Sequence, residues 1–252
     1  MIELKNIHKT FDDREILKGI STVFEKGKTN LIIGQSGSGK TVLMKCIVGL
    51  FEPTGGEVLY DGRNFFGMSK KERTFLRREM GMIFQNAALF DSMTVLDNVR
   101  FPLDMFSTLS WRDRQRKANE CLERVNLKGA ESKLPGEISG GMQKRVAIAR
   151  AISMNPKYLF CDEPNSGLDP QTSLVIDELI HGITQDYGMT TIINTHDMNS
   201  VMGIGENILF LYNGRKEWQG NKDEVMTSSN ELLNNFIFAS DLFRKVKKAE
   251  LE

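Results

Sequence analysis

The chain has 252 residues, of which 40% are hydrophobic and 26% charged, and its 33 basic residues equal its 33 acidic ones. This composition is that of a globular protein with a sizeable core, and the neutral balance excludes a global attraction to nucleic acid or to an anionic membrane, leaving only local basic clusters. The three cysteines, Cys46, Cys121 and Cys161, are far apart and lie among apolar residues, which predicts free core thiols in a reducing compartment.

The first 60 residues are predicted to form strands and turns. "IELKNIHKTF" alternates apolar and polar residues, "TNLIIG" is a short apolar run, and "GGEVLYDGRN" follows a Gly-Gly break. A helix is expected to begin near Gly39, because five apolar residues then share one face: Val42, Leu43, Cys46, Ile47 and Leu50. No apolar run approaches the ~20 residues that span a bilayer, so another chain is expected to supply any membrane span.

Further along, apolar strands alternate with helical stretches. "MGMIF" is a predicted strand, residues 94–154 are predicted to be helical, and "KYLFCDE", a helix near 170–187, "MTTIINTHD" and "NILFLYNGRKEW" follow. One apolar side of the helical part is made by Trp111, Ala118, Cys121, Leu122 and Val125. This order predicts an α/β fold with a mainly parallel sheet covered by helices on both faces, and an inserted helical subdomain.

The end of the chain begins as a helix, "NELLNNFIF", and then becomes basic around "FRKVKK". Its apolar side chains Leu232, Leu233, Phe236 and Ile237 favour a structural contact. Contact with the second ATPase subunit, contact with a regulator, and a tail that extends into solvent are the alternatives.

"GQSGSGKT", Gly34 to Thr41, fits the pattern GxxxxGK[ST] between an apolar strand and a helix. The glycines let successive N–H groups point inward, and the helix N-terminus adds the positive end of its dipole. Lys40 is expected to reach the β- and γ-phosphates of a nucleotide, and Thr41 to offer its hydroxyl to Mg²⁺. The predicted phosphate-binding residues are Gly34, Gln35, Ser36, Gly37, Ser38, Gly39, Lys40, Thr41 and Val42.

Three other strands end in polar residues. After "YLFC", Asp162 is expected to hold Mg²⁺ and Glu163 to polarise the attacking water, although two acids at a strand end are also a common polar cap. His196 ends "IINTH" and is expected to contact the γ-phosphate, the alternative being a structural hydrogen bond. Gln85 ends "MIFQ" and is expected to bind the metal or the water.

"SGGMQKRVAIARA", from Ser139 to Ala151, places a second donor-rich turn at the start of a helix. One loop already holds the nucleotide. A second anion-binding helix end makes sense if Ser139, Gly140 and Gly141 bind the nucleotide of another copy of the chain.

In order and spacing, "GQSGSGKT", "ISGGM", "CDEP", "SGLD" and "THD" resemble the motifs of the ATP-binding-cassette (ABC) ATPases. The resemblance implies a P-loop, RecA-like fold with an antiparallel β subdomain. It assigns residues 1–228 to the cassette, with the core at 1–88 and 156–228, the helical subdomain at 89–155 and an extension at 229–252. It also implies that two copies sandwich two ATP molecules head to tail.

The resemblance also implies a role for each matching residue. Glu163 is the general base, His196 the γ-phosphate sensor, and Gln85 contacts Mg²⁺ and links to the membrane subunit. Mg²⁺ is bound by Thr41, Gln85 and Asp162, ATP by the loop residues above and across the dimer by Ser139, Gly140 and Gly141, and the segment Ser166 to Asp169 connects the two sites. Phe11 matches the aromatic residue that stacks on adenine; its alternative is a core aromatic.

Two departures indicate a subgroup. Met142 stands where the family usually has Gln, and Ile138 where it usually has Leu. With "ALFDSMTVLDNVRFPL" and "DEPNSGLDP", they resemble the ATPase subunits of bacterial lipid transporters of the Mla type. That resemblance implies a permease and an MCE-domain protein as partners, phospholipid as cargo, and a place on the cytoplasmic face of the inner membrane. The apolar stretch "NAALFDSMTV" is the expected permease surface, unless it packs on the helical subdomain.

Three other functions are alternatives to lipid transport. An importer of a small polar solute, such as an amino acid, shares much of the sequence. A non-transport cassette acting in DNA repair or on ribosomes is disfavoured, because no long coiled coil, zinc motif or second cassette is present, so no nucleic-acid partner is expected. A nucleotide-gated binding module without turnover is disfavoured by Glu163.

Overall fold

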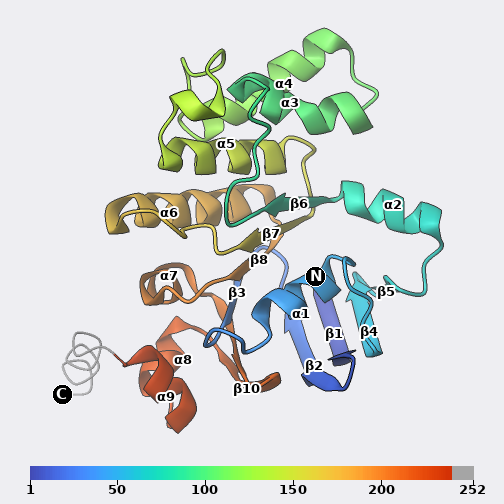
Figure 1. The fold of residues 1–252 in the computed structure, drawn as a ribbon, viewed down its shortest axis with the longest axis vertical. Helices are drawn as coiled ribbons and strands as arrows, with labels where there is room; N and C mark the ends of the chain where they lie inside the picture. The colour runs from blue at the N-terminus through green and yellow to red at the C-terminus, as the bar shows by residue number, and fades with distance from the viewer. Residues whose placement is uncertain (240–252) are drawn as a thin grey trace. The chain divides into compact units, whose positions relative to one another are not determined.

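The computed structural model describes residues 1–239, so the basic end of the predicted tail lies outside the described residues. The chain divides into two units (Figure 1). Of the described residues, the first unit holds 1–25, 29–67 and 194–239, and the second holds 26–28 and 68–193. The finer boundaries expected from the sequence, with a helical subdomain at 89–155, stay a prediction.

The first unit contains an antiparallel sheet and the strands that flank the GxxxxGK[ST] motif. The antiparallel sheet has the order β2-β1-β4-β5 and comprises β1 (Ile2–Phe11), β2 (Arg14–Phe24), β4 (Gly55–Tyr60) and β5 (Arg63–Asn64). The wholly buried β3 (Thr29–Ile33) pairs in parallel with β9 (Asn207–Tyr212), which pairs antiparallel with β10 (Arg215–Gly220). A fully apolar run such as "LII" suits a strand that is covered on both faces.

In the described part of this unit there are four helices: α1 (Lys40–Ile47), α7 (Met198–Ile204), α8 (Lys222–Thr227) and α9 (Glu231–Ile237). In α9, Phe236 stacks on Phe210 of β9 with ring centroids 5.4 Å apart, and Leu233 and Ile237 are buried. The apolar side chains of α9 therefore make the structural contact that their pattern predicted. In contrast, Leu50 lies beyond the end of α1 and is exposed rather than sharing its buried face.

The second unit combines three strands with most of the helices. β6 (Met80–Ile83) pairs in parallel with β7 (Tyr158–Asp162), and β8 (Thr190–Asn194) is the next neighbour of β7. The helices are α2 (Lys70–Arg78), α3 (Val95–Phe106), α4 (Trp111–Arg124), the 3₁₀ turn η1 (Pro135–Glu137), α5 (Gly140–Ile152) and α6 (Pro170–Tyr187). Figure 1 shows α3, α4 and α5 packed together, with α6 against α5. The parallel pairs in both units bear out the predicted parallel sheet.

The predicted helical stretch is three helices, each started by a hydroxyl side chain. Thr94, Ser110 and Ser139 accept hydrogen bonds from backbone N–H groups three residues later, which satisfies donors that a helix start leaves open. On α4, four of the five residues expected on the apolar side are buried. Trp111 is 62% exposed, and the prediction was wrong for it. As the first residue of α4 it lies two turns before Ala118, beyond the buried end of the stripe.

All three cysteines are free and buried, as expected. Burial raises the pKa of the Cys46 and Cys121 thiols to about 11 and that of Cys161 further still. Within residues 1–239, no helix has the length and apolar character needed to cross a bilayer.

Candidate functional site

The loop after β3 takes a shape that only glycine permits at two points. Gly34 has a φ of 150°, and a Cβ added there would lie 2.3 Å from the backbone oxygen of Leu211. Gly39, with a φ of 108°, precedes α1, and its added Cβ would lie 3.0 Å from Leu17 Cδ2 on β2. At both positions φ is positive and an added Cβ would lie close to another element, so only glycine fits. These two glycines therefore let the backbone between them curl before the start of α1, as a loop that binds phosphate through its N–H groups requires.

Lys40 and Ser38 give this loop its chemistry. Lys40 Nζ donates to the backbone oxygens of Gly34 at 2.8 Å and Gln35 at 3.2 Å, so its ammonium lies across the loop, and the residue is only 8% exposed. Ser38 Oγ is buried and has no hydrogen-bond partner among the described residues. A buried hydroxyl without a partner is unfavourable unless a ligand satisfies it. A phosphate oxygen fits both the cation and this hydroxyl.

His196 and Phe11 belong to the same unit as the loop. The N–H of Thr195, just before His196, donates to the backbone oxygen of Ile32 at 3.2 Å, which places this segment beside the strand that leads into Gly34. Phe11 ends β1 and is 38% exposed, so it is not a core aromatic side chain. Its ring contacts Phe51 edge to face, with centroids 5.2 Å apart, and leaves surface available for stacking.

In the second unit, strand register brings Gln85 and Glu163 together. Ile83 and Cys161 are partners in the parallel pair β6·β7, so Gln85 and Glu163 each follow two residues later. Gln85 Nε2 donates to Ser166 Oγ at 3.0 Å, and the N–H of Ser166 donates to the backbone oxygen of Glu163 at 3.1 Å. Glu163 has a φ of 49°, a left-handed conformation that is uncommon for a non-glycine residue.

The turn before α5 is exposed at Ser139 and Gly140. Ser139 Oγ accepts from the N–H of Met142 at 3.3 Å. A Cβ on Gly141 would lie 2.8 Å from Thr172 Cγ2, so packing within the chain explains this glycine. A Cβ on Gly140 would meet only Leu168 Cδ2, at an ordinary 3.9 Å. Packing within the chain does not require Gly140 to lack a side chain, whereas a close ligand would.

Sequence reasoning missed two cations on α5 that hold the segment after β6. Lys144, 5% exposed, donates to the backbone oxygen of Gln85. Arg150 donates to the backbone oxygens of Ala87 and Ala88, both at 2.7 Å. These alanines have φ values of 58° and 49°, a left-handed conformation that costs about 1–2 kcal/mol per residue. Burial lowers the pKa of both cations, as expected when a charge leaves water.

A cavity of about 460 Å³ lies beside this segment, within the second unit. Its lining includes Met80 and Met82 of β6 and Phe101, Pro102 and Phe106 of α3. The charged side chains on its wall are Arg77, Arg78 and Arg150, and none of its described lining residues is acidic. It is therefore an apolar hollow of positive character, lined in part by the stretch "NAALFDSMTV" through Ala88 and Phe90.

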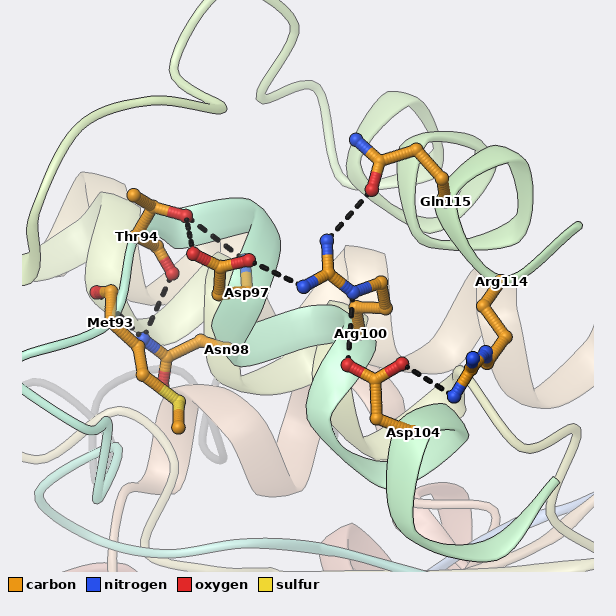
Figure 2. A network of polar contacts seen from close by, with 8 residues as sticks. All are labelled: Met93, Thr94, Asp97, Asn98, Arg100, Asp104, Arg114 and Gln115. Atoms are coloured by element: carbon orange, nitrogen blue, oxygen red, sulfur yellow. Dashed lines mark hydrogen bonds and ion pairs between the residues drawn. The ribbon is translucent and has the colours of Figure 1, made fainter. Parts of the chain in front are cut away.

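A polar network fixes α3, which forms one wall of the cavity (Figure 2). Arg100 Nε donates to Asp104 at 2.9 Å, its Nη2 pairs with Asp97 at 2.8 Å, and its Nη1 donates to Gln115 of α4 at 2.7 Å. Arg114 of α4 pairs with Asp104 at 2.9 Å.

The buried Asn98 holds the segment before α3. Its Nδ2 donates to the backbone oxygens of Phe90, Met93 and Thr94 at 3.1–3.2 Å. These bonds set the place of α3 and of the preceding loop, and with them the shape of the hollow.

The predicted site residues fall into two groups, each brought together within its own unit. The first unit holds Phe11, the loop from Gly34 to Val42 and His196, and the second holds Gln85, Asp162, Glu163 and the turn from Ser139 to Gly141. For Mg²⁺, the Thr41 hydroxyl and the Asp162 carboxylate are hard oxygen donors of the kind this ion prefers. Among residues 1–239 there is no cluster of three or more His, Cys, Asp or Glu side chains arranged to hold a metal.

Comparison with known proteins points in one direction. Residues 17–166 match the family described as ABC transporter. Over 257 residues the chain is 37% identical to Protein TRIGALACTOSYLDIACYLGLYCEROL 3 of Arabidopsis thaliana, covering 95% of this chain and 74% of that protein. It is 42% identical over 223 residues to the methionine import ATP-binding protein MetN of Carboxydothermus hydrogenoformans, covering 87% of this chain and 66% of that protein.

Solved structures agree with these relatives. The dimeric ATP-binding cassette MJ0796 bound to ADP and Pi superposes with a TM-score of 0.79 at 34% identity, covering 88% of this chain and 99% of that one. The structure of cbiO1 from Clostridium perfringens, described as part of the ABC transporter complex cbiONQ, gives a TM-score of 0.85 at 28% identity and covers 100% of this chain and 98% of that one. The predicted fold, with an α/β core, an antiparallel sheet and a helical subdomain, is confirmed.

Proposed function

Because this chain belongs to the ABC transporter family and is an ATP-hydrolysing cassette, we propose that two copies of it close on ATP and drive phospholipid transport through a membrane permease. The observation that carries ATP binding is the loop after β3, where the Lys40 ammonium and the Ser38 hydroxyl, which has no hydrogen-bond partner among the described residues, are placed to bind an anion. When bound, Mg²⁺ neutralises charge that develops on the phosphates. Thr41, Asp162 and Gln85 are the residues proposed to hold it.

Within this proposal, Glu163 accepts a proton from the attacking water and His196 contacts the γ-phosphate. The hydrogen bonds from Gln85 to Ser166 and from Ser166 to Glu163 support a cluster that orients the base. The left-handed backbone of Glu163 adds support for a functional role, because such strain gathers at active sites. Phe11, exposed beside Phe51, is proposed to stack on adenine.

The homodimer is proposed from Gly140. Its missing side chain serves no packing within the chain, and Ser139 beside it is exposed at the start of a helix of 13 residues. A phosphate brought by a second copy fits this place. The similar cassette MJ0796, which is dimeric and bound to ADP and Pi, supports this reading.

The permease is proposed to dock in the hollow beside the Gln85 segment. Three arginines and no acidic residue on an apolar wall fit an amphipathic segment that carries a carboxylate. The description of cbiO1 as part of a transporter complex supports a permease partner. With the permease docked in this way, we propose that the chain works at the cytoplasmic face of the bacterial inner membrane.

Phospholipid as cargo is proposed from the resemblance that Ile138, just before the start of α5, and Met142, in its first turn, help to carry. The name of the Arabidopsis relative contains that of a galactolipid, which supports a lipid as the class of cargo. An MCE-domain protein is then the expected third component. The second candidate is import of a small polar solute such as an amino acid, which the MetN relatives favour at up to 42% identity.

The test is co-purification of the full chain from its native membranes in mild detergent, with identification of the proteins and lipids that accompany it. A permease with an MCE-domain protein and phospholipid supports lipid transport, and a permease with a solute-binding protein overturns it in favour of solute import. Phe84→Ser removes an exposed side chain of the hollow, and Leu174→Ser removes one from outside it. We expect only Phe84→Ser to lose the permease; equal capture by both variants contradicts docking in the hollow.

A further inference from the structure

The helix α2 is strongly basic in a chain whose net charge is zero. Its nine residues, "KKERTFLRR", include five Lys or Arg and one Glu, and only Leu76 is buried. That Glu, Glu72, caps the helix by accepting hydrogen bonds from Ser69 at 2.6–2.8 Å. The nine residues of α2 therefore carry a net charge of +4, and Glu72 is engaged in the cap.

Large apolar side chains are exposed beside these cations. Phe75 of α2 is 53% exposed and Phe106, at the end of α3, is 47% exposed. The Arg78 guanidinium lies 5.4 Å from the centre of the Phe75 ring and 5.8 Å from that of Phe106, so the two helices share one surface. Met105 of α3, Leu109 in the connection and Trp111 at the start of α4 are also exposed, each by at least 41%.

We propose that this basic and aromatic surface, formed by α2 and by residues 105–111, rests on an anionic phospholipid bilayer. We refer to it as the α2 surface. Aromatic and aliphatic side chains enter the boundary between headgroups and acyl chains, while Lys and Arg stay with the phosphates. The nearby carboxylate of Asp104 is already neutralised by Arg100 and Arg114, so the surface keeps its positive character.

A simple solvated face does not account for the α2 surface, because five large apolar side chains remain in water there. The α2 surface continues into the hollow, because Arg78 and Phe106 line both. We favour a membrane over a second protein outside the hollow, because exposed aromatic side chains beside cations suit the boundary between headgroups and acyl chains. Anionic lipid matches both components at once, and the charge on α2 supplies the attraction.

The test uses the purified full chain and sedimentation with vesicles of phosphatidylglycerol and phosphatidylcholine, without nucleotide or permease. We expect binding to these vesicles and none to phosphatidylcholine alone, with the binding weakened by added salt. Lys70→Gln/Lys71→Gln should weaken it about 30-fold, because each cation near an anionic surface changes affinity about fivefold. These lysines lie in the first turn of α2, where cations oppose the helix dipole, so their removal leaves the helix stable.

The control is Lys26→Gln/Arg215→Gln, which removes two exposed cations far from α2 in the sequence and should bind like the unaltered chain. A second readout uses Trp218→Phe, which leaves Trp111 as the single tryptophan; its emission should shift to the blue on binding. Absence of binding, equal binding to neutral vesicles, or equal loss in both double variants overturns the proposal. If the unaltered chain does not bind vesicles and Lys70→Gln/Lys71→Gln no longer captures the permease, the α2 surface contacts a protein instead. The vesicle results do not depend on ATP hydrolysis, cargo or permease, so a failure of this proposal can be distinguished from a failure of the proposed function.

Discussion

Replacing Arg150 by Lys tests whether α5 holds the segment after β6 in its strained form. The guanidinium donates to the backbone oxygens of both Ala87 and Ala88 at 2.7 Å, and a lysine ammonium in its place reaches one of them. A hydrogen bond from a charged donor contributes about 1.5–3 kcal/mol. The left-handed strain of the two alanines remains when that bond is lost. We therefore expect Arg150→Lys to lower the free energy of unfolding by about 2 kcal/mol.

The measurement is urea unfolding followed by far-ultraviolet circular dichroism with linear extrapolation. At a slope of about 3 kcal/mol per M, the midpoint should fall by about 0.7 M. Arg145→Lys is the matched control on the same helix, because the bond from Arg145 to the backbone oxygen of Val125 is 3.5 Å long and contributes little. Equal midpoints for Arg150→Lys and Arg145→Lys would refute the view that Arg150 supports this segment.

Three further predictions concern the nucleotide. Glu163→Gln should keep ATP binding, lower turnover by at least about 10²-fold because the amide accepts no proton, and accumulate a dimer in gel filtration with ATP; turnover at the level of the unaltered chain would contradict the base assignment. Ser139→Arg should abolish ATPase activity yet leave binding of a fluorescent nucleotide by the monomer intact, and unchanged activity would speak against a role across the dimer. Phe11→Ala should weaken nucleotide binding about fivefold through loss of a stacking contact of about 1 kcal/mol, whereas Phe11→Tyr should not, and calorimetry that finds equal affinities would remove Phe11 from the site.

Features encoded by neighbouring residues could be predicted from the sequence, and features made by distant residues could not. The loop from Gly34 to Thr41 is continuous in the sequence, so its glycines and lysine predict its conformation. That Gln85 bonds to Ser166 depends on the register of two strands that are far apart in the chain. Lys144 and Arg150 bond to backbone oxygens, and because every residue has one, no side-chain pattern marks the acceptors. The helix α2 has a single buried residue, so no apolar period predicted it.

The same helix that offers Ser139 to solvent also holds the wall of the hollow. α5 begins at the exposed turn. Within its next three turns, Lys144 and Arg150 donate hydrogen bonds to the carbonyls of Gln85, Ala87 and Ala88. A helix of 13 residues moves as a rod, and bonds to charged donors are among the strongest that join it to a loop. A ligand that displaces the start of α5 must therefore either break these bonds or carry the loop with it. Since Ala88 and Arg150 both line the hollow, movement of the loop together with α5 changes the shape of the hollow. Two adjacent alanines in a left-handed conformation lower the resistance to such a change, because leaving that conformation releases strain.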